Sequence, residues 1–342
     1  MQKPILTFLT DHYAIPPIQQ IAPIDAGYLT QNFALYTADS GTPAYFLKQY
    51  RYTKAEPVIA AHAAKHFFAS AGVPVILPIV SNSGETFLFL EGHFYSLFPY
   101  IQGRHLQRGR FSRKALISTA QMMAHIHRTG NGVTLPHVRI SKPQKSYQAF
   151  VDTAEQILAR IPQTGQTPFD QLAQETILLK LDLAKAHRTA IETINLPSDH
   201  LLHGDYHDLN LFFDAHDQVS HVFDWEKTKV GSRSLQLIRA IKFICFGNPD
   251  NFVAVHSDEN FARARIYLQA YHEAYPITHA EIAQAITARY LQNMVSLWIE
   301  DEHYLQNNGR TDVFLEAAYA SIRYSMAYRD EYIERLCIGI VK

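Results

Sequence analysis

One polar stretch in the second half of the chain has the residue types and the spacing of a phosphotransfer site. It reads His203-Gly204-Asp205-Tyr206-His207-Asp208-Leu209-Asn210. The spacing fits the pattern H-x-D-x-x-x-x-N, in which the Asp orients an attacking hydroxyl group and the Asn holds a metal ion. The pattern predicts that a second metal-binding Asp follows.

Asp224 meets this expectation, because it follows Asn210 by 14 residues and comes directly after two short apolar runs, 211–213 and 219–223. A polar turn at 214–217 separates the two runs, which is the signal of a β-hairpin. The alternative interpretation is a polar turn in an ordinary α/β domain. It becomes the weaker one once the hairpin and Asp224 are counted, and we interpret the stretch as functional.

These segments resemble the signatures of the aminoglycoside phosphotransferase and choline kinase family. His203-Gly204-Asp205 matches its H-G-D element, and Phe223-Asp224-Trp225-Glu226 matches its D-W-E element, which stands where protein kinases carry D-F-G. Matching upstream segments are 27–32, 47–48, 71–75 and 98–103, so the resemblance covers residues 1–240. The opening, with Gly27 and Asn32 in a loop between strands, is most similar to the homoserine-kinase-like branch.

The resemblance implies an α+β fold of the protein-kinase-like kind, with two lobes. A small N-terminal nucleotide-binding lobe with an antiparallel sheet would span residues 1–98. A hinge would follow at 99–103. A large helical C-terminal lobe, residues 104–342, would carry the catalytic loop and the acceptor site.

The resemblance also implies a reaction, in which Mg-ATP donates its γ-phosphoryl group to a hydroxyl group of a small molecule. Asp205 would orient that hydroxyl group and accept its proton, and His203 would brace the loop. Asn210 and Asp224 would hold Mg²⁺. Homoserine, an amino sugar, an amino alcohol and an aminoglycoside-like compound all remain open as acceptors.

The nucleotide would be held by the N-terminal lobe and the hinge. Lys48 ends an apolar strand and corresponds to the lysine that contacts the α- and β-phosphates. Gly27 and Asn32 would belong to a loop that closes over the phosphates, and the hinge backbone would read the adenine edge through Pro99, Tyr100 and Ile101. An ordinary hairpin turn and a solvent-facing strand lysine are the alternatives for these two elements.

The helix expected at 60–71 departs from the family, which places a Glu there as the partner of the lysine. Glu56 precedes Pro57 at the start of this helix and lies too early. The partner of Lys48 is therefore open, and a catalytically weak kinase-fold binding module remains an alternative that an ATP-hydrolysis assay would separate. A second departure from the family pattern is Gln236, which stands where the family has an Asp.

The elements that must position these residues follow from hydrophobic periodicity and from Gly and Pro breaks. Helices are expected at 5–13, 60–71, 112–128, 147–161, 169–194, 261–275, 279–299 and 313–336. Strands are expected at 20–25, 32–37, 44–48, 78–80, 86–90 and 93–98. A loop is expected at 131–146.

Three histidines have both a functional and an ordinary structural interpretation, and we favour the structural one for each. His127 resembles the family's helix-terminal histidine, but we favour a core histidine with a satisfied ring. His62 and His66 are spaced to bind a metal from one helix face, yet no carboxylate or cysteine accompanies them.

Composition excludes several classes of partner. The 342 residues are 47% hydrophobic and 18% charged, as in a folded globular protein, and the net charge of −1 comes from scattered residues. We therefore expect no nucleic-acid or membrane partner. Cys245 and Cys337 stand far apart in apolar surroundings, which favours a reducing compartment and predicts a soluble, cytoplasmic protein. The oligomeric state is open.

The last candidate feature is the acidic segment after Trp298. Three consecutive carboxylates follow Ile299, and Asp301 and Glu302 share a helix face with the indole ring. This combination could hold an ammonium group of an acceptor by charge and by the ring face. The alternative is a solvated helix end with Trp298 in the core.

Overall fold

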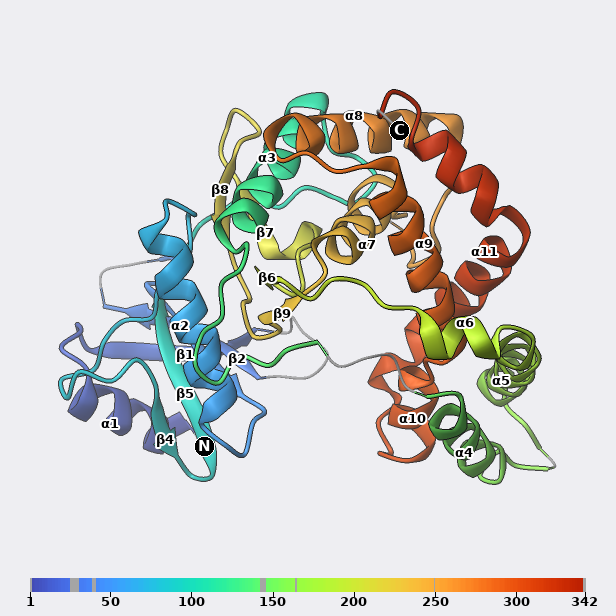
Figure 1. Cartoon of the computed structure of the whole chain (residues 1–342). Helices are drawn as coiled ribbons and strands as arrows, with labels where there is room; N and C mark the ends of the chain where they lie inside the picture. Colours follow the sequence, from blue (N-terminus) through green and yellow to red (C-terminus); the bar gives the residue numbers. More distant parts are fainter. Residues whose placement is uncertain are drawn as a thin grey trace.

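A computed structural model gives the architecture of the chain. The structure describes residues 2–24, 31–38, 41–141, 146–163, 165–248 and 250–340, with side chains from residue 5 onward. A five-stranded sheet with two helices forms one lobe, and a mainly helical body forms the other (Figure 1). In the described part of the chain, no helix is long and apolar enough to cross a membrane.

The sheet of the N-terminal lobe is antiparallel with strand order β1-β2-β3-β5-β4. Its strands are β1 (Ile18–Ile24), β2 (Asn32–Thr37), β3 (Tyr45–Tyr50), β4 (Leu88–Leu90) and β5 (His93–Pro99). Successive side chains of a strand point to opposite faces. Leu47 on β3 is therefore buried in the core under α1 (Gln2–His12), whereas its neighbour Lys48 faces the cavity between the lobes.

Helix α2 (Glu56–Ser70) connects the two lobes. Its residues Ala64 and Phe68 are fully buried in the main core of the helical lobe. The Phe68 ring packs against the buried Trp225 with 4.8 Å between ring centroids. The helix ends where Gly72 adopts a φ of 83°, a left-handed conformation that favours glycine. This helix thus fixes the sheet relative to the segment that carries Asp224.

The helical lobe contains nine α-helices in the described ranges, and Ser or Thr caps the N-terminus of most of them. The first seven to be placed are α3 (Arg113–Thr129), α4 (Tyr147–Leu158), α5 (Pro168–Ala186), α6 (Arg188–Thr193), α7 (Arg233–Cys245), α8 (Asp258–Ala274) and α9 (His279–Met294). The last two are α10 (Trp298–Tyr304) and α11 (Leu315–Leu336). A 3-10 turn, η2 (Gly309–Phe314), lies between them.

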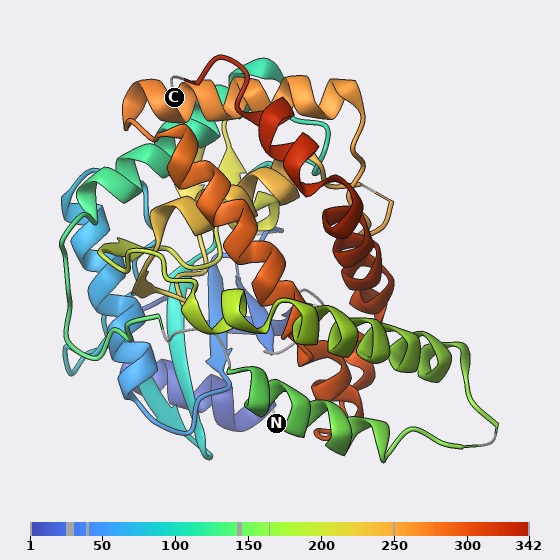
Figure 2. The ribbon, with the colours of Figure 1, turned by 45° about the vertical axis from the view of Figure 1, so that its right-hand side comes forward.

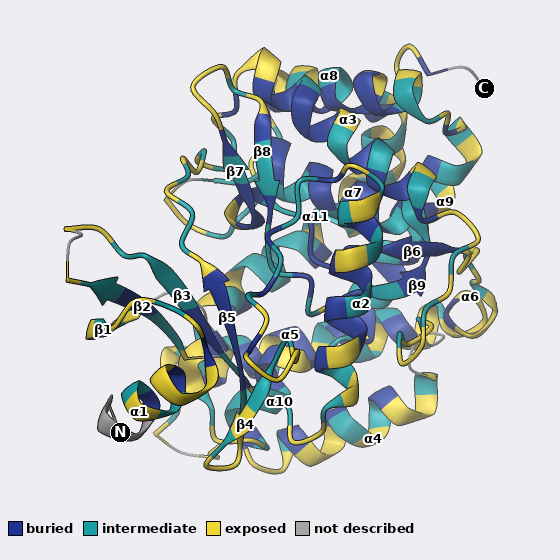
Figure 3. Ribbon diagram, turned by 90° about the vertical axis from the view of Figure 1, so that its left-hand side faces the viewer, coloured by how far each residue is buried: buried dark blue, intermediate teal, exposed yellow. Residues whose placement is uncertain are grey.

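Two hydrophobic cores stabilise this lobe, and α9 belongs to both. Its first half, with Ile282 and Ala285, packs into the core formed by α3, α7 and α8. Its second half, with Leu291 and Met294, packs against α4, α5 and α10. Figure 2 shows α9 crossing from one group of helices to the other, and Figure 3 shows that buried residues concentrate inside this lobe. The two groups of helices are therefore held as one body.

Most of the expected elements are present, and three expectations are wrong. Residues 78–80 form no strand, although Ile79 donates one hydrogen bond to the carbonyl oxygen of Leu97. The helix expected over 169–194 is two helices, because His187 adopts φ −108° and ψ 18° and ends α5. The helix expected over 279–299 ends at Met294, and a new helix begins at Trp298.

Candidate active site

Two short antiparallel strand pairs hold the polar stretch of the sequence. Strand β6 (His200–Leu202) pairs with β9 (Lys229–Gly231), and β7 (Leu211–Phe213) pairs with β8 (Val219–Val222) as the expected hairpin. Beyond the hairpin, the N–H of Phe223 donates to the carbonyl oxygen of Asn210 at 2.9 Å. Segments 203–210 and 223–227 therefore lie side by side, with η1 (Asp208–Asn210) closing the loop.

Gly204 is required by the close approach of these two segments. Its φ is 85°, and a Cβ atom added there would lie 1.8 Å from the carbonyl oxygen of Lys227. Both facts exclude any other residue without backbone movement. The Gly of the H-G-D element thus lets the Asp205 loop sit directly on the segment that follows Asp224.

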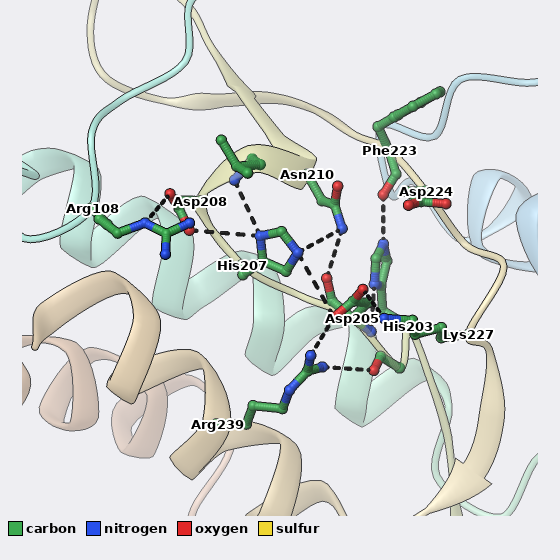
Figure 4. A network of polar contacts seen from close by, with 12 residues as sticks. Arg108, His203, Asp205, His207, Asp208, Asn210, Phe223, Asp224, Lys227 and Arg239 are labelled. Carbon is green, nitrogen blue, oxygen red and sulfur yellow. Dashed lines mark hydrogen bonds and ion pairs between the residues drawn. The ribbon is translucent and has the colours of Figure 1, made fainter. Parts of the chain in front are cut away.

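His203 connects the same two segments through its ring (Figure 4). Its Nε2–H donates to the carbonyl oxygen of Phe223 at 2.7 Å, and its Nδ1 accepts from the N–H of Asp205 at 3.2 Å. A neutral imidazole satisfies both contacts. Burial lowers the pKa of His203 to about 4, so the ring stays neutral and acts as a brace for Asp205.

Asp205 is a buried carboxylate with two cations against it. Lys227 Nζ donates to Oδ2 at 2.7 Å, and Arg239 Nη2 lies 2.6 Å from Oδ1. The Arg239 contact is an ion pair whose N–H is not directed at Oδ1, since that oxygen has no aligned hydrogen-bond donor among the described residues. Arg239 also donates through Nη1 to the carbonyl oxygen of Gly204 at 3.0 Å. Each oxygen of Asp205 therefore faces a cationic side chain, and Oδ1 is buried from solvent.

The charges around Asp205 keep it ionised. Burial raises the pKa of Asp205, but the contacts with His207, Arg239 and Lys227 outweigh burial and lower the pKa well below its usual range. His207 lies between two carboxylates, 3.7 Å from Asp205 Oδ1 and 3.6 Å from Asp208 Oδ1. Burial lowers the pKa of His207, and the two carboxylates raise it above its ordinary value. The site thus carries a fixed negative charge on Asp205.

Asn210 and Asp224 present oxygen atoms of the kind that Mg²⁺ prefers. The Nδ2 group of Asn210 donates to the backbone oxygen of Asp205 at 2.9 Å, which leaves the amide oxygen as its free coordinating atom. Asp224 has a φ of 59°, which lies in the left-handed region of the backbone. Burial raises its pKa, but the charge of Lys48 lowers it below the ordinary value, so the carboxylate is ionised. This donor set fits a divalent cation.

Lys48 has two carboxylate partners in the structure. Neither lies in the helix where the family places its glutamate. Lys48 Nζ lies 2.8 Å from Asp224 Oδ1 and forms a second close ion pair with Glu226 Oε1. Burial lowers the pKa of Lys48, and the two carboxylates raise it above the ordinary value. Glu56 is exposed at the start of α2, and α2 presents His62 to the sheet. The His62 ring bonds to Tyr50 Oη at 3.0 Å and to Thr86 Oγ1 at 2.7 Å, which explains the residue without a metal.

The prediction for His127 is confirmed. Its Nδ1 accepts from Tyr271 Oη at 2.8 Å, and its Nε2–H donates to Gln236 Oε1 at 3.1 Å. Burial lowers its pKa to about 3, so the ring is a neutral part of the core. Gln236, which replaces the family Asp, is therefore the acceptor for this ring.

One cavity of about 1990 Å³ lies between the lobes and collects most of the residues above. It is larger than the usual 300–1,000 Å³ of a pocket for one small ligand, so it has room for a nucleotide and an acceptor together. Asn32 and Lys48 line its N-terminal side. Asp205, Asn210, Phe223, Asp224 and Glu226 line the opposite side.

The segment expected as the hinge also lines this cavity, from Pro99 through Tyr100 and Ile101 to Gly103. A Cβ atom at Gly103 would lie 2.0 Å from the Phe212 ring, so a glycine is needed there. The N–H of Tyr100 already donates to the carbonyl oxygen of Ala44 at 3.0 Å. A bound base would therefore use other backbone groups of 99–103. Gly27 lies outside the described residues.

The acidic segment after Trp298 is placed differently from the expectation. Trp298, Ile299 and Glu300 line the cavity, whereas Asp301 and Glu302 do not. The short helix α10 meets the cavity with its N-terminal end, so position along the helix decides exposure to the cavity more than the helix face does. Asp301 accepts from Gln306 and Glu302 from Asn308, both outside the cavity lining. The acid that reaches the cavity is Glu300, which is fully buried and paired with Lys180 at 3.1 Å.

Sequence reasoning missed the cations around Asp205. Lys227 directly follows the D-W-E element, and a lysine two residues before a strand gives no signal by itself. Arg239 lies on α7, far from Asp205 in the sequence, and only the packing of α7 against β6 brings it close. Arg108, which pairs with Asp208 at 3.1 Å, was missed for the same reason.

Comparison with known protein families gives one match over most of the chain. A family model described as "Phosphotransferase enzyme family" matches residues 20–276. No curated protein sequence matches the chain.

Solved structures share the architecture at low sequence identity. A spectinomycin phosphotransferase, solved with ADP and spectinomycin, has a TM-score of 0.64 at 16% identity, with 98% of this chain and 97% of that chain covered. A choline kinase from Cryptosporidium parvum has a TM-score of 0.62 at 12% identity, with 99% of both chains covered. A microcompartment-associated aminopropanol kinase has a TM-score of 0.61 at 13% identity, with 98% and 99% covered. The expected kinase-like, two-lobed α+β fold is confirmed by these likenesses.

Proposed function

The chain belongs to the phosphotransferase enzyme family, and we propose that it transfers the γ-phosphoryl group of ATP, with Mg²⁺, to a hydroxyl group of a small molecule. One observation carries the proposal. Lys48, Asp205, Asn210 and Asp224 come from three separate segments of the chain and line a single cavity. Their side chains are those that phosphoryl transfer needs, because positioning and charge stabilisation supply most of its catalysis.

Asp205 is the residue that we propose for the acceptor hydroxyl group. Its ionised carboxylate would accept a hydrogen bond from the hydroxyl group and take the proton as the bond to phosphorus forms. A carboxylate with a lowered pKa is a weak base, which suits a loose transition state in which the proton leaves late. Lys227 and Arg239 hold the carboxylate in place, and His203 fixes its backbone.

Lys48, Asn210 and Asp224 are the residues that we propose for the triphosphate. Asn210 and Asp224 would hold Mg²⁺, which when bound supplies neutralising charge to the β- and γ-phosphate oxygens. Lys48 would contact the α- and β-phosphates, with Glu226 keeping its ammonium group at the cavity wall. The hinge residues Pro99, Tyr100 and Ile101 would hold the base, and Gly27 and Asn32 would lie near the phosphates.

The proposal also covers the class of acceptor and the cellular compartment. The acceptor classes suggested by the sequence are homoserine, an amino sugar, an amino alcohol and an aminoglycoside-like compound, and the resemblance of the opening segment favours the homoserine-kinase-like branch. Buried thiols at Cys245 and Cys337 support a reducing compartment, and we place the protein in the cytoplasm.

The test is Mg²⁺-dependent ADP release from ATP across a panel of hydroxyl-bearing metabolites. ADP release that rises with one acceptor, together with a phosphorylated product by mass spectrometry, is the expected result. Binding of Mg-ATP without ADP release for any acceptor, or for water, would favour the alternative of a kinase-fold binding module. Failure to bind Mg-ATP would refute the proposal.

A further inference from the structure

The wall of the cavity is strongly basic although the chain as a whole carries a net charge of −1. Eleven Lys and Arg side chains line the cavity, against four Asp and Glu side chains. The cations are Lys48, Arg51, Arg104, Arg108, Arg139, Lys180, Lys227, Lys229, Arg239, Lys242 and Arg289, and the carboxylates are Asp205, Asp224, Glu226 and Glu300. The excess of positive charge is therefore local to the cavity.

The cavity's four carboxylates are already paired. Lys48 is paired with both Asp224 and Glu226, and Lys180 with Glu300. Lys227 and Arg239 share Asp205. These ion pairs involve all four carboxylates of the cavity lining. Several cations of the lining therefore have no carboxylate partner among the described residues.

Five of the cavity's cations, Arg51, Arg139, Lys229, Lys242 and Arg289, form no ion pair with a carboxylate that the structure describes, and three of them lie on the elements next to Asp205. Lys229 on β9, Lys242 on α7 and Arg289 on α9 form no ion pair with any carboxylate that the structure describes. Lys242 Nζ has a neutral partner, Ser321 Oγ at 3.0 Å. We call Lys229, Lys242 and Arg289 the basic wall. It is built from three elements, and α7 and α9 pack against each other.

The lowered pKa values in the basic wall indicate that its positive charge is not balanced by nearby carboxylates of the described chain. Burial and the charges of Arg289 and Arg239 lower the pKa of Lys242 to about 7. Burial and Arg239 lower the pKa of Arg289 to about 10. Cations that are desolvated beside one another raise the free energy of the empty cavity, and an anion between them would lower it.

The basic wall lies on the acceptor side of Asp205. Arg239 reaches Asp205 from α7, one turn before Lys242 on the same helix, and Lys229 follows Lys227 by two residues. The hinge and Lys48, which we assign to the nucleotide, belong to the other lobe. An anion at the basic wall would therefore belong to the second substrate.

We propose that the acceptor is an anionic hydroxyl compound, whose carboxylate or phosphate group binds between Lys242 and Arg289 while its hydroxyl group reaches Asp205. This inference rests on the proposed function. The hydroxyl oxygen forms the new bond to the γ-phosphorus, the bond between that phosphorus and the ADP oxygen breaks, and the hydroxyl proton passes to Asp205. A polycationic acceptor would meet like charges on this wall.

The test compares four probes that share a three-carbon diol and differ in charge: D-glycerate, glycerol 3-phosphate, glyceramide and 3-aminopropane-1,2-diol. Each is titrated by calorimetry into the full-length protein saturated with Mg²⁺ and AMP-PNP, so that the nucleotide site cannot take the anion. We expect the two anions to bind at least about tenfold more tightly than the amide and the amine, a difference of about 1.4 kcal/mol. The comparison of glycerate with glycerol phosphate separates a carboxylate site from a phosphate site.

Two variants then locate the effect. Lys242→Gln and Arg289→Gln should each weaken the anions about tenfold while leaving the affinity for AMP-PNP within about twofold. Both should keep or raise the melting temperature, since they remove partly buried positive charge that has no carboxylate partner in the described part of the chain. Arg104→Gln is the matched control, because Arg104 also lines the cavity but is half-exposed and paired with Asp217. It should change none of these affinities.

The outcomes separate this inference from the proposed function. The inference is overturned if the amide or the amine binds as tightly as glycerate, or if neither anion binds at about 20 mM. It is also overturned if the two variants weaken AMP-PNP and spare the anions, because the wall would then serve the nucleotide. Failure of AMP-PNP to bind at all would refute the proposed function and this inference with it. The wild-type comparison among the four probes decides the question even if a variant does not fold.

Discussion

Replacing Lys48 by Met tests the ion-pair cluster at the centre of the cavity. The substitution keeps most of the side chain's volume and removes its charge, so that Asp224 and Glu226 lose their common partner. Two carboxylates would then lie close together without an ion-pair partner, and the buried Lys65 is a remaining cation whose charge acts on both. The expected consequences are a loss of stability in the free protein and a loss of turnover in the enzyme.

The burial of the three side chains sets the magnitude. Lys48 and Glu226 are 6% and 11% exposed, which makes their contact a buried pair. Removing one partner of such a pair costs about 3–5 kcal/mol. Asp224 is 34% exposed, so solvent screens part of its charge, and we expect a value near the lower end, about 3 kcal/mol. Turnover should fall about 10²–10³-fold, the usual effect of removing one preorganised donor to a transition state.

Urea denaturation without nucleotide and kcat/KM for ATP with an identified acceptor measure the two effects. Glu56→Ala is the control, because Glu56 occupies the start of α2, is exposed and should cost little in either assay. A Glu56→Ala enzyme as damaged as Lys48→Met would show that Glu56 reaches the lysine during turnover. A Lys48→Met protein with unchanged stability would contradict the ion-pair cluster itself.

Three further predictions concern the loop and the core. Asp224→Ala should abolish Mg²⁺-dependent ATP binding in calorimetry, while Asn210→Ala should weaken it less, since a hard cation depends more on carboxylate than on amide oxygen; equal losses would contradict this metal site. Gly204→Ala should lower the free energy of unfolding by at least about 2 kcal/mol, through its positive φ and the clash with a carbonyl oxygen, and an unchanged thermal melt would refute this requirement. Burial lowers the pKa of His203 to about 4 and of His127 to about 3, whereas the unfolded value is near 6.5, so the unfolded chain binds more protons below pH 6.5. Stability should therefore be constant with respect to these rings above pH 6.5 and fall as the pH is lowered toward 4, by about 3 kcal/mol for His203 alone, and urea midpoints that stay level over this range would contradict the buried neutral rings.

The residues that could be predicted from the sequence are those whose roles depend on local spacing. The interval from His203 to Asn210 and the hairpin before Asp224 are short-range features, and local strand pairing brings the two ends together. The antiparallel sheet and the main helices could be predicted from periodicity for the same reason. The assignment of Lys48 rested on the family resemblance, because strand alternation alone does not distinguish a cavity-facing lysine from a solvent-facing one, and the structure shows it on the central strand β3.

The partners of these residues depend on long-range packing, which no spacing encodes. Glu226 was part of a recognised motif, but its contact with Lys48 spans the two lobes. Arg239 reaches Asp205 only because α7 packs beside β6. The prediction for the acidic segment after Trp298 was wrong for a related reason. It assumed that one side of α10 faces the cavity, whereas the N-terminal end of α10 does.

The predicted bounds of helices and strands were wrong where the local backbone conformation overrides sequence propensity. His187 ends α5 with a non-helical ψ, although the apolar pattern continues into α6. Residues 78–80 have strand-like composition, but they make only one backbone bond to β5 and form no ladder. Neither departure moves a residue of the cavity.

The most direct test of the central claim is the turnover of Asp205→Asn beside Asp208→Asn, with Mg-ATP affinity measured on both proteins. Asp205 lines the cavity, whereas Asp208 is buried against Arg108 and does not line it. We predict that Asp205→Asn lowers kcat about 10²–10⁴-fold and leaves the Kd for Mg-ATP within about twofold, as expected for loss of a positioned general base. A near-normal kcat in Asp205→Asn, or a loss no larger than that of Asp208→Asn, would contradict the assignment of Asp205 to the acceptor hydroxyl group.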